Sequence, residues 1–148
     1  MSNLFNPKMT KYVNDKLDWV EVINKGVEIL VENGYAKQTL ADAILESTKQ
    51  FGAYYVLERG LALLHAAPGD YALKNGTSVM ILDDFVRFNN QEDKEARIIV
   101  TLSAVDSSSH LNILQEFSHY FMNDEFKKEI LQVKNIEEFW NLIDKYKA

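Results

Sequence analysis

The stretch Ala96-Arg97-Ile98-Ile99-Val100-Thr101-Leu102 predicts a β-strand, because apolar and β-branched residues follow one another in it almost without a break. Residues 78–82, Ser-Val-Met-Ile-Leu, have the same character. Apolar runs of this kind, which do not alternate with polar residues, favour strands that are covered on both faces. The two runs therefore predict the centre of a sheet that lies between two other layers.

The rest of the chain supplies the other elements of such a layered fold. Two further short runs, residues 53–57 and 60–64, are bounded by turn formers and predict strands. Apolar residues at helical spacing predict helices before and after the strand block. The sequence thus predicts an α/β fold, a three-layer sandwich with a central mixed β-sheet of about five strands flanked by helices. The helices are expected at residues 18–32, 36–50, 111–122, 125–131 and 136–146.

Composition narrows the class of protein. A length of 148 residues is that of a single domain, here residues 1–148. The formal net charge of -6, with lysine and arginine scattered along the chain, argues against a nucleic-acid surface. The chain has no cysteine, which excludes disulfides and thiolate chemistry and leaves only histidine and carboxylates as ligands for zinc.

The distribution of apolar residues indicates the compartment. The N-terminal residues lack the apolar core of a signal peptide, and no apolar run approaches the ~20 residues that span a bilayer. A cytoplasmic protein without direct membrane insertion is therefore expected. Its 8 phenylalanines and 7 tyrosines provide enough apolar surface for a homodimer, although the sequence does not decide the oligomeric state.

One histidine ends an apolar run, in Gly60-Leu61-Ala62-Leu63-Leu64-His65-Ala66-Ala67-Pro68. An imidazole at the end of a buried strand is held rigidly and still reaches solvent, which suits a nucleophile. A core or rim histidine that donates to a backbone carbonyl explains the same pattern equally well.

A second histidine follows the polar quartet Asp106-Ser107-Ser108-Ser109, which is typical of a helix N-cap. At ~100° per residue, His110 falls within about 40° of the apolar stripe of the following helix, so its ring is expected to point inward. His119 lies about 180° away and is expected to be a surface residue without a role. An inward imidazole beside the free N–H groups of a helix N-terminus forms an anion site, which makes phosphate chemistry plausible if His65 lies close by.

The two histidine segments together resemble a known family. The run from Gly60 to Pro68, the segment Gly76-Thr77-Ser78 that opens an apolar strand, and the run from Leu102 through Asp106 to His110-Leu111 are similar to enzyme IIA components of the sugar phosphotransferase system. The similarity is to the mannitol/fructose type and, within it, to the ascorbate-like branch. It extends from about residue 22 to 146, in order and at family length.

The resemblance implies a phosphotransferase: a cytoplasmic phosphocarrier that accepts a phosphoryl group from HPr and passes it to a IIB component, which serves a membrane permease. His65 would be the phosphorylated nucleophile, and His110 the second active-site histidine, which stabilises the phosphoryl group. The backbone N–H groups of Ala66, Ser108 and Ser109 are the candidate hydrogen-bond donors to the phosphoryl group. The family fold is a central mixed sheet flanked by helices, and no metal or organic cofactor is implied.

Two residues beside His65 depart from the family pattern. Leu64 stands where proline is usual, and Ala67 stands where the ascorbate-like branch usually has arginine. The loss of the guanidinium removes a bidentate phosphate donor, for which lysine substitutes only as a point charge. Cations from other segments could replace it, although solvated surface charge is the simpler interpretation of each. The candidates are Arg59, Lys74 and Arg87.

Further interpretations stay open at this stage. An alternative is a IIA-like regulatory module that is phosphorylated or binds a regulator without onward transfer, and Ala67 motivates it. A small hydrolase that uses a histidine with Asp106 is weaker, because no serine or cysteine nucleophile motif is present and a helix cap explains Asp106. An exposed apolar docking patch near His65 is also expected, with ordinary loop packing as the alternative. Its candidate residues are Leu64, Ala66, Ala67 and Tyr71.

Overall fold

A mixed five-stranded sheet forms the middle layer of the molecule, in a computed structural model that describes residues 4–147. The strand order is β1-β4-β5-β3-β2. The β1/β4 and β5/β3 pairs are parallel, and the β4/β5 and β3/β2 pairs are antiparallel. The strands are β1 (Thr10–Val13), β2 (Val56–Glu58), β3 (Gly60–Leu64), β4 (Gly76–Arg87) and β5 (Glu95–Ser103).

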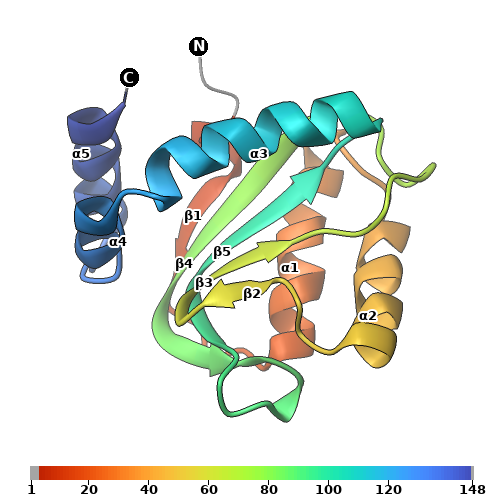
Figure 1. The fold of residues 1–148 in the computed structure, drawn as a ribbon, viewed down its shortest axis with the longest axis horizontal. Helices are drawn as coiled ribbons and strands as arrows, with labels where there is room; N and C mark the ends of the chain where they lie inside the picture. The colour runs from red at the N-terminus through yellow and green to blue at the C-terminus, as the bar shows by residue number, and fades with distance from the viewer. Residues whose placement is uncertain (1–3, 148) are drawn as a thin grey trace.

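Helices cover both faces of this sheet, so the predicted three-layer α/β architecture is confirmed (Figure 1). One face packs against α1 (Trp19–Glu32) and α2 (Thr39–Phe51), and the other against α3 (Ser107–Phe121), α4 (Asp124–Ile130) and α5 (Ile136–Tyr146). Short 3-10 helices, η1 (Pro7–Met9) and η2 (Phe88–Asn90), precede β1 and follow β4. No helix of residues 4–147 is long and apolar enough to cross a bilayer.

The side chains of β3 show how the sheet serves two cores at once. Leu61 and Leu63 lie in the cluster under α3, α4 and α5, whereas Ala62 and Leu64 lie in the cluster under α1 and α2. Successive residues of a strand point to opposite faces, so a run that is buried on both sides must be apolar at every position. This explains why the central strands have continuous apolar sequences.

The element boundaries differ from the prediction where tertiary pairing decides them. The strand β1 was not predicted, and it pairs in parallel with β4 through residues such as Thr10 and Val79. The helix α2 begins at Thr39 rather than at residue 36, because Ala36 forms an isolated bridge with Ala72. The helix α3 begins at Ser107, four residues before the predicted start, with Asp106 as its N-cap.

The helix α1 approaches the sheet closely at Gly26. A Cβ atom added there would lie 2.4 Å from Oγ1 of Thr101, so only glycine fits at this contact. The hydroxyl of Ser78 donates to the Gly26 carbonyl over 2.7 Å. The neighbouring Thr101 hydroxyl is buried without a hydrogen-bond partner among the described residues. One polar side chain of this pair therefore stabilises the contact, and the other does not.

A buried arginine ties the C-terminal helices to the sheet. Arg97 on β5 is 5% exposed, and its guanidinium donates over 2.7 Å to each of three backbone carbonyls. One of these, from Leu82, lies on β4, and the other two, from Leu131 and Val133, lie in the link between α4 and α5. The guanidinium thus satisfies three buried acceptors that belong to two separate parts of the chain.

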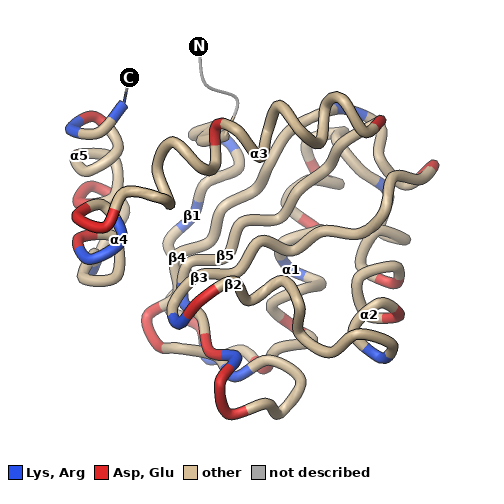
Figure 2. Tube along the Cα trace, in the orientation of Figure 1, with Lys and Arg blue, Asp and Glu red and all other residues tan. Residues whose placement is uncertain are grey.

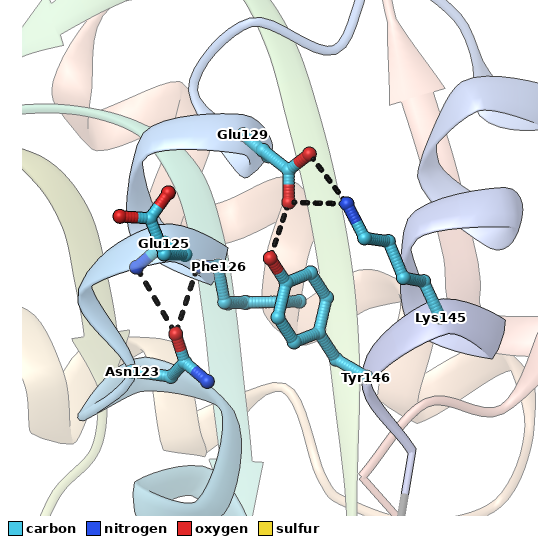
Figure 3. A network of polar contacts seen from close by, with 6 residues as sticks. All are labelled: Asn123, Glu125, Phe126, Glu129, Lys145 and Tyr146. Atoms are coloured by element: carbon cyan, nitrogen blue, oxygen red, sulfur yellow. Dashed lines mark hydrogen bonds and ion pairs between the residues drawn. The ribbon is translucent and has the colours of Figure 1, made fainter.

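A network of polar contacts at the surface involves α4 and α5 (Figure 3). The carboxylate of Glu129 accepts hydrogen bonds from Lys145, over 3.0 Å, and from the Tyr146 hydroxyl. The side chain of Asn123 caps the N-terminus of α4 by accepting from two backbone N–H groups. The Glu129 contacts join α4 to α5 at the end of the molecule that is far from the N-terminus of α3 (Figure 1).

Candidate functional site

The sheet brings the two predicted site histidines together at the C-terminal ends of β3 and β5. The strands β3 and β5 are parallel neighbours, so their C-terminal ends lie side by side. His65 directly follows β3, and β5 leads through a short connection into α3, whose first turn carries His110. The two rings have a centroid separation of 5.8 Å and an interplanar angle of 66°. The inward direction expected for His110 is confirmed.

The His65 ring is fixed by a hydrogen bond to its own strand. Its Nδ1 atom lies 2.7 Å from the carbonyl oxygen of Leu63. A carbonyl oxygen can only accept, so Nδ1 carries the proton of the neutral imidazole. The Nε2 atom then keeps its lone pair, which is the state that a nitrogen nucleophile requires.

Two tyrosines hold the backbone that follows β3: Tyr71, which was expected only as part of the apolar patch, and Tyr54, which the sequence did not single out. The Tyr54 hydroxyl donates to the carbonyl oxygen of His65, and the Tyr71 hydroxyl donates to that of Ala67. The Tyr54 ring also lies edge-on to the His65 ring, with centroids 5.1 Å apart. Burial raises the pKa of the Tyr54 hydroxyl above its ordinary value, so this hydroxyl stays protonated and can donate.

A depression of about 590 Å³ surrounds the two histidines and extends from α2 to α3 across the end of β3. Phe51, at its edge, is 72% exposed, and Ala67, Pro68 and Ser107 are also exposed, so the depression lies at the surface. None of the residues that line it is lysine or arginine. The lining consists of Ser47, Phe51, Tyr54, His65, Ala66, Ala67, Pro68, Ser107 and His110.

The environment of His110 favours its neutral form. Burial lowers the pKa of this imidazole below its ordinary value of about 6.5, and electrostatic repulsion between the protonated forms of the two imidazoles lowers it further. At neutral pH, His110 is therefore neutral and can act as one hydrogen-bond donor and one acceptor.

The first turn of α3 is held by a polar link to the loop before β4. The Asp106 carboxylate accepts from the N–H of Ser109 over 2.8 Å, and these bonds lower the pKa of the carboxyl group. The Asn75 side chain donates to the Ser109 hydroxyl and accepts from the N–H of Val105, each over 2.9 Å. The helix end that carries His110 is thus fixed relative to the loop that follows His65.

The backbone N–H groups that were predicted to bind the phosphoryl group do not all lie at the depression. Ala66 lines the depression, and Ser107 lines it from the start of α3. Ser108 and Ser109 do not belong to this lining, and the Ser109 N–H is already bonded to Asp106. Binding of a phosphoryl group by the backbone of Ala66, Ser108 or Ser109 remains a prediction.

The three cations considered as replacements for the missing arginine have other contacts. Arg59 and Arg87 each lie 3.7 Å from the Glu95 carboxylate, at the end of β3, β4 and β5 that is opposite to His65. This end of the strands lies at the bottom of Figure 2, where charged residues of both signs are gathered. Lys74 lies over the Tyr35 ring, 5.5 Å from its centroid. Surface charge, the simpler interpretation, therefore describes them.

The expected apolar patch is only partly present. Leu64 is fully buried, because its side chain points from β3 into the core under α1 and α2, so its inclusion in the patch was wrong. Ala66 and Tyr71 are half-buried, and Ala67 is exposed. Larger exposed apolar side chains come instead from the neighbouring elements, namely Phe51, Leu73, Val105 and Leu111.

The third histidine is at the surface, as expected, but it has partners. The Nε2 atom of His119 lies 3.0 Å from the carbonyl oxygen of Tyr146, at the end of α5. Its ring also lies edge-on to that of Tyr120, with centroids 4.9 Å apart. His119 therefore contributes to the contact between α3 and α5, far from the depression.

Comparison with known proteins gives consistent matches. Residues 3–146 match the family model described as phosphoenolpyruvate-dependent sugar phosphotransferase system, EIIA 2. The mannitol-specific cryptic phosphotransferase enzyme IIA component of Escherichia coli K12 is 28% identical over 145 residues, which are 98% of each chain. The solution structure of the mannitol-specific cryptic enzyme IIA from Escherichia coli has a TM-score of 0.84 at 26% identity, and the match covers 97% of this chain and 96% of that one.

Two other matches extend this picture. The ascorbate-specific EIIA component of Escherichia coli K12 is 29% identical over 131 residues, 88% of this chain and 85% of that one. An Escherichia coli mannitol enzyme IIA, solved in complex with phosphorylated enzyme IIB, has a TM-score of 0.78 at 19% identity, with 95% and 97% of the two chains covered. At this identity the second likeness shows the fold alone.

Proposed function

The chain belongs to the EIIA 2 family of the phosphoenolpyruvate-dependent sugar phosphotransferase system, and from this membership we propose that it is a cytoplasmic phosphocarrier that bears the phosphoryl group on His65. The donor is HPr, and the acceptor is a IIB component that serves a membrane permease. The observation that carries the proposal is the free Nε2 atom of His65, which the Leu63 carbonyl leaves unprotonated beside His110 in a surface depression.

Acceptance of the phosphoryl group is an in-line displacement. The Nε2 lone pair of His65 forms a bond to phosphorus while the bond from phosphorus to the donor histidine nitrogen breaks. The electron pair of the broken bond stays on the donor nitrogen. The transferring group carries its charge on three equatorial oxygens, so the site contributes mainly by positioning and by electrostatic stabilisation. The Leu63 and Tyr54 contacts hold the ring and its backbone in place for this step.

Onward transfer benefits from the same hydrogen bond. The Nδ1 proton stays between the ring and the Leu63 carbonyl during the reaction, so the phosphorylated imidazole is a cation. A cationic ring leaves as a neutral imidazole when the nucleophile of the IIB component attacks phosphorus. Retention of the Nδ1 proton therefore favours transfer out of the site.

The residues around His65 stabilise the phosphoryl group in different ways. His110 donates a hydrogen bond from across the depression, and the N–H of Ala66 donates from the backbone next to His65. The amides of Ser108 and Ser109 interact with the Asp106 carboxylate, so they act through the positive end of α3 rather than by direct bonds. A shallow position is also required, because another protein must reach the ring, and the exposed edge of the depression meets this requirement.

Incubation with phosphorylated HPr tests the proposal. The expected product is one acid-labile, base-stable phosphoryl adduct, mapped by mass spectrometry to His65 and absent in His65→Gln. The His119→Gln variant is the matched control and should be phosphorylated at the normal rate, since His119 lies far from the depression. No adduct, or an unchanged adduct in His65→Gln, would contradict the proposal.

A second candidate function is a regulatory module that accepts the phosphoryl group without passing it on. It is favoured by the lack of lysine and arginine among the residues that line the depression. The two functions differ in a chase experiment with a IIB component of the same gene cluster. Rapid loss of label from His65 to IIB supports transport, and a stable label in the presence of IIB supports regulation.

A further inference from the structure

A phosphoryl group on His65 brings negative charge into a depression whose lining contains no lysine or arginine. The position of Ala67, where the ascorbate-like branch usually has arginine, supplies only a methyl group here. The two arginines considered above are paired with Glu95 at the opposite end of the strands. Lys74, the third cation considered, lies over the Tyr35 ring and does not line the depression. The positive charge of the phosphorylated His65 ring balances only part of the phosphoryl charge, so a group that gains positive charge on phosphorylation would stabilise it further.

His110 is the group that can acquire this charge. Its ring lies 5.8 Å from that of His65, on the wall of the depression, and it is partly exposed, so water can reach it. In the unphosphorylated protein its pKa lies below the ordinary value, because of burial and of His65. It is thus neutral near pH 7 and has a nitrogen free to bind a proton.

The other groups around His110 do not carry out this role. Tyr54, which reaches the site from the segment before β2, has a raised pKa because of burial and stays neutral. Asp106, the N-cap of α3, is an exposed carboxylate that accepts from the Ser109 N–H. In the loop after β3, the Tyr71 hydroxyl is bonded to the Ala67 carbonyl.

The helix α2 adds no charge of its own to the depression. It lines the depression with Ser47 and Phe51, neither of which titrates in this pH range. Its neighbouring charged residues, Lys49 and Glu46, are exposed and lie 3.7 Å from each other. The remaining titratable group that faces His110 is His65, which becomes the phosphorylated residue.

We propose that His110 takes up one proton from solvent when His65 is phosphorylated, so that the His110 imidazolium is the cation that this depression lacks in the free protein. This inference rests on the proposed function. In the coupled step, the bond from phosphorus to the donor nitrogen breaks, the bond from phosphorus to Nε2 of His65 forms, and one proton moves from water to the His110 ring. The two rings exchange no proton, because Nδ1 of His65 keeps its own.

Proton uptake makes the phosphorylation equilibrium depend on pH. Between the pKa of His110 in the free protein and its raised pKa in the phosphorylated protein, each unit of acidification favours the phosphorylated form by a factor of about 10. A His110→Gln variant keeps a hydrogen-bond donor but cannot be protonated, so this dependence should disappear in it.

The test is an NMR titration of the histidine ring protons in the free and the phosphorylated protein. Phosphorylation is carried out in parallel with phosphorylated HPr and with potassium phosphoramidate, a chemical donor that needs no partner protein, and phosphorus NMR monitors the product. The expected result is a pKa of His110 that rises by about one unit or more on phosphorylation. The ring-proton signals of His119, which contacts the end of α5, are the control and should be the same in the free and the phosphorylated protein at each pH.

The outcomes separate the two proposals. If phosphoramidate labels His65 and HPr does not, the proposed donor is wrong, while the titration still tests proton uptake. If phosphohistidine forms and the pKa of His110 stays the same or falls, proton uptake is overturned and the phosphocarrier function stands. If neither donor labels His65, both are overturned.

Discussion

The Nδ1 atom of His65 lies 2.7 Å from the carbonyl oxygen of Leu63, so the backbone of β3 selects the tautomer of the ring that the strand positions. The acceptor belongs to a residue two positions earlier in the same chain, so no partner protein is needed to supply it. The reactivity of this histidine is therefore set by local backbone geometry before any partner binds.

The first prediction concerns this tautomer. Nitrogen-15 NMR of the neutral ring should show the proton on Nδ1 and the lone pair on Nε2, because the carbonyl can only accept. After phosphorylation, coupling between phosphorus and nitrogen should place the phosphoryl group on Nε2. A neutral ring protonated mainly at Nε2, or phosphorus on Nδ1, would contradict the geometry. The His119 ring provides an internal contrast, because its Nε2 atom lies 3.0 Å from the Tyr146 carbonyl oxygen and should carry the proton of that ring.

The second prediction is that Tyr54→Phe slows phosphoryl acceptance and destabilises the protein slightly. The substitution removes the hydroxyl that donates to the His65 carbonyl and leaves the ring that packs against the imidazole. The lost hydrogen bond is worth about 1 kcal/mol in unfolding free energy. Looser placement of the nucleophile should lower kcat/KM about tenfold.

The matched control for this variant is Tyr146→Phe. It also removes a tyrosine hydroxyl with one hydrogen-bond acceptor, here the Glu129 carboxylate, far from the depression. Stopped-flow transfer from phosphorylated HPr should be normal in it. Equal rates in Tyr54→Phe and the wild type would remove Tyr54 from the positioning of His65.

The third prediction is that Thr101→Val stabilises the protein by about 1 kcal/mol, measured by urea unfolding. The Thr101 hydroxyl is buried with no partner among the described residues, and valine has nearly the same shape. Ser78→Ala is the contrasting variant, since the Ser78 hydroxyl donates to the Gly26 carbonyl. It should destabilise by a similar amount. Loss of stability in Thr101→Val would mean that its hydroxyl has a partner.

The sequence predicted the parts of the fold that local patterns determine. The strand β3 and the helix α5 were predicted with the observed boundaries, because an uninterrupted apolar run and a helical period are local signals. The strand β1 was missed. It is only four residues long, and its stability comes from parallel pairing with β4, about 70 residues later in the chain. A pairing of that range leaves no signal in a short window.

In the site too, the sequence predicted the residues that local patterns mark and missed those that depend on contacts made in the folded chain. His65 and His110 were predicted because each lies at the end of an element with a clear apolar pattern. Tyr54 and the Leu63 carbonyl were not, although they hold the His65 segment. The carbonyl has no sequence signature, since every residue carries one, and Tyr54 lies in the run 53–57 that predicts a strand. Leu64 was misplaced because its face on β3 depends on which side of the sheet its neighbours occupy.

The fourth prediction concerns the buried guanidinium of Arg97. Its replacement in Arg97→Met leaves the three carbonyls that it contacts without a donor and should destabilise the protein by about 2–4 kcal/mol. Two of these carbonyls belong to the link between α4 and α5. Amide hydrogen exchange should therefore accelerate most in these two helices.

Arg87→Met is the control for this substitution. Arg87 is exposed and forms one ion pair, with Glu95, so its loss should change stability by less than about 1 kcal/mol. If Arg97→Met were as stable as Arg87→Met, the hydrogen bonds of Arg97 would contribute little to the docking of α4 and α5.

The fifth prediction is that His110 makes the unphosphorylated protein less stable in acid. Its pKa in the folded chain is lowered by burial and by His65, so the unfolded chain binds a proton at this residue more readily. Stability contributed by the neutral ring is fully present above the unfolded pKa of about 6.5 and decreases as the pH falls toward the folded pKa. Urea unfolding at a series of pH values between about 7.5 and 5 should show this decrease, and His110→Gln should show a flatter profile. A His110→Gln profile parallel to that of the wild type would show that the His110 ring is protonated equally in the folded and unfolded chains.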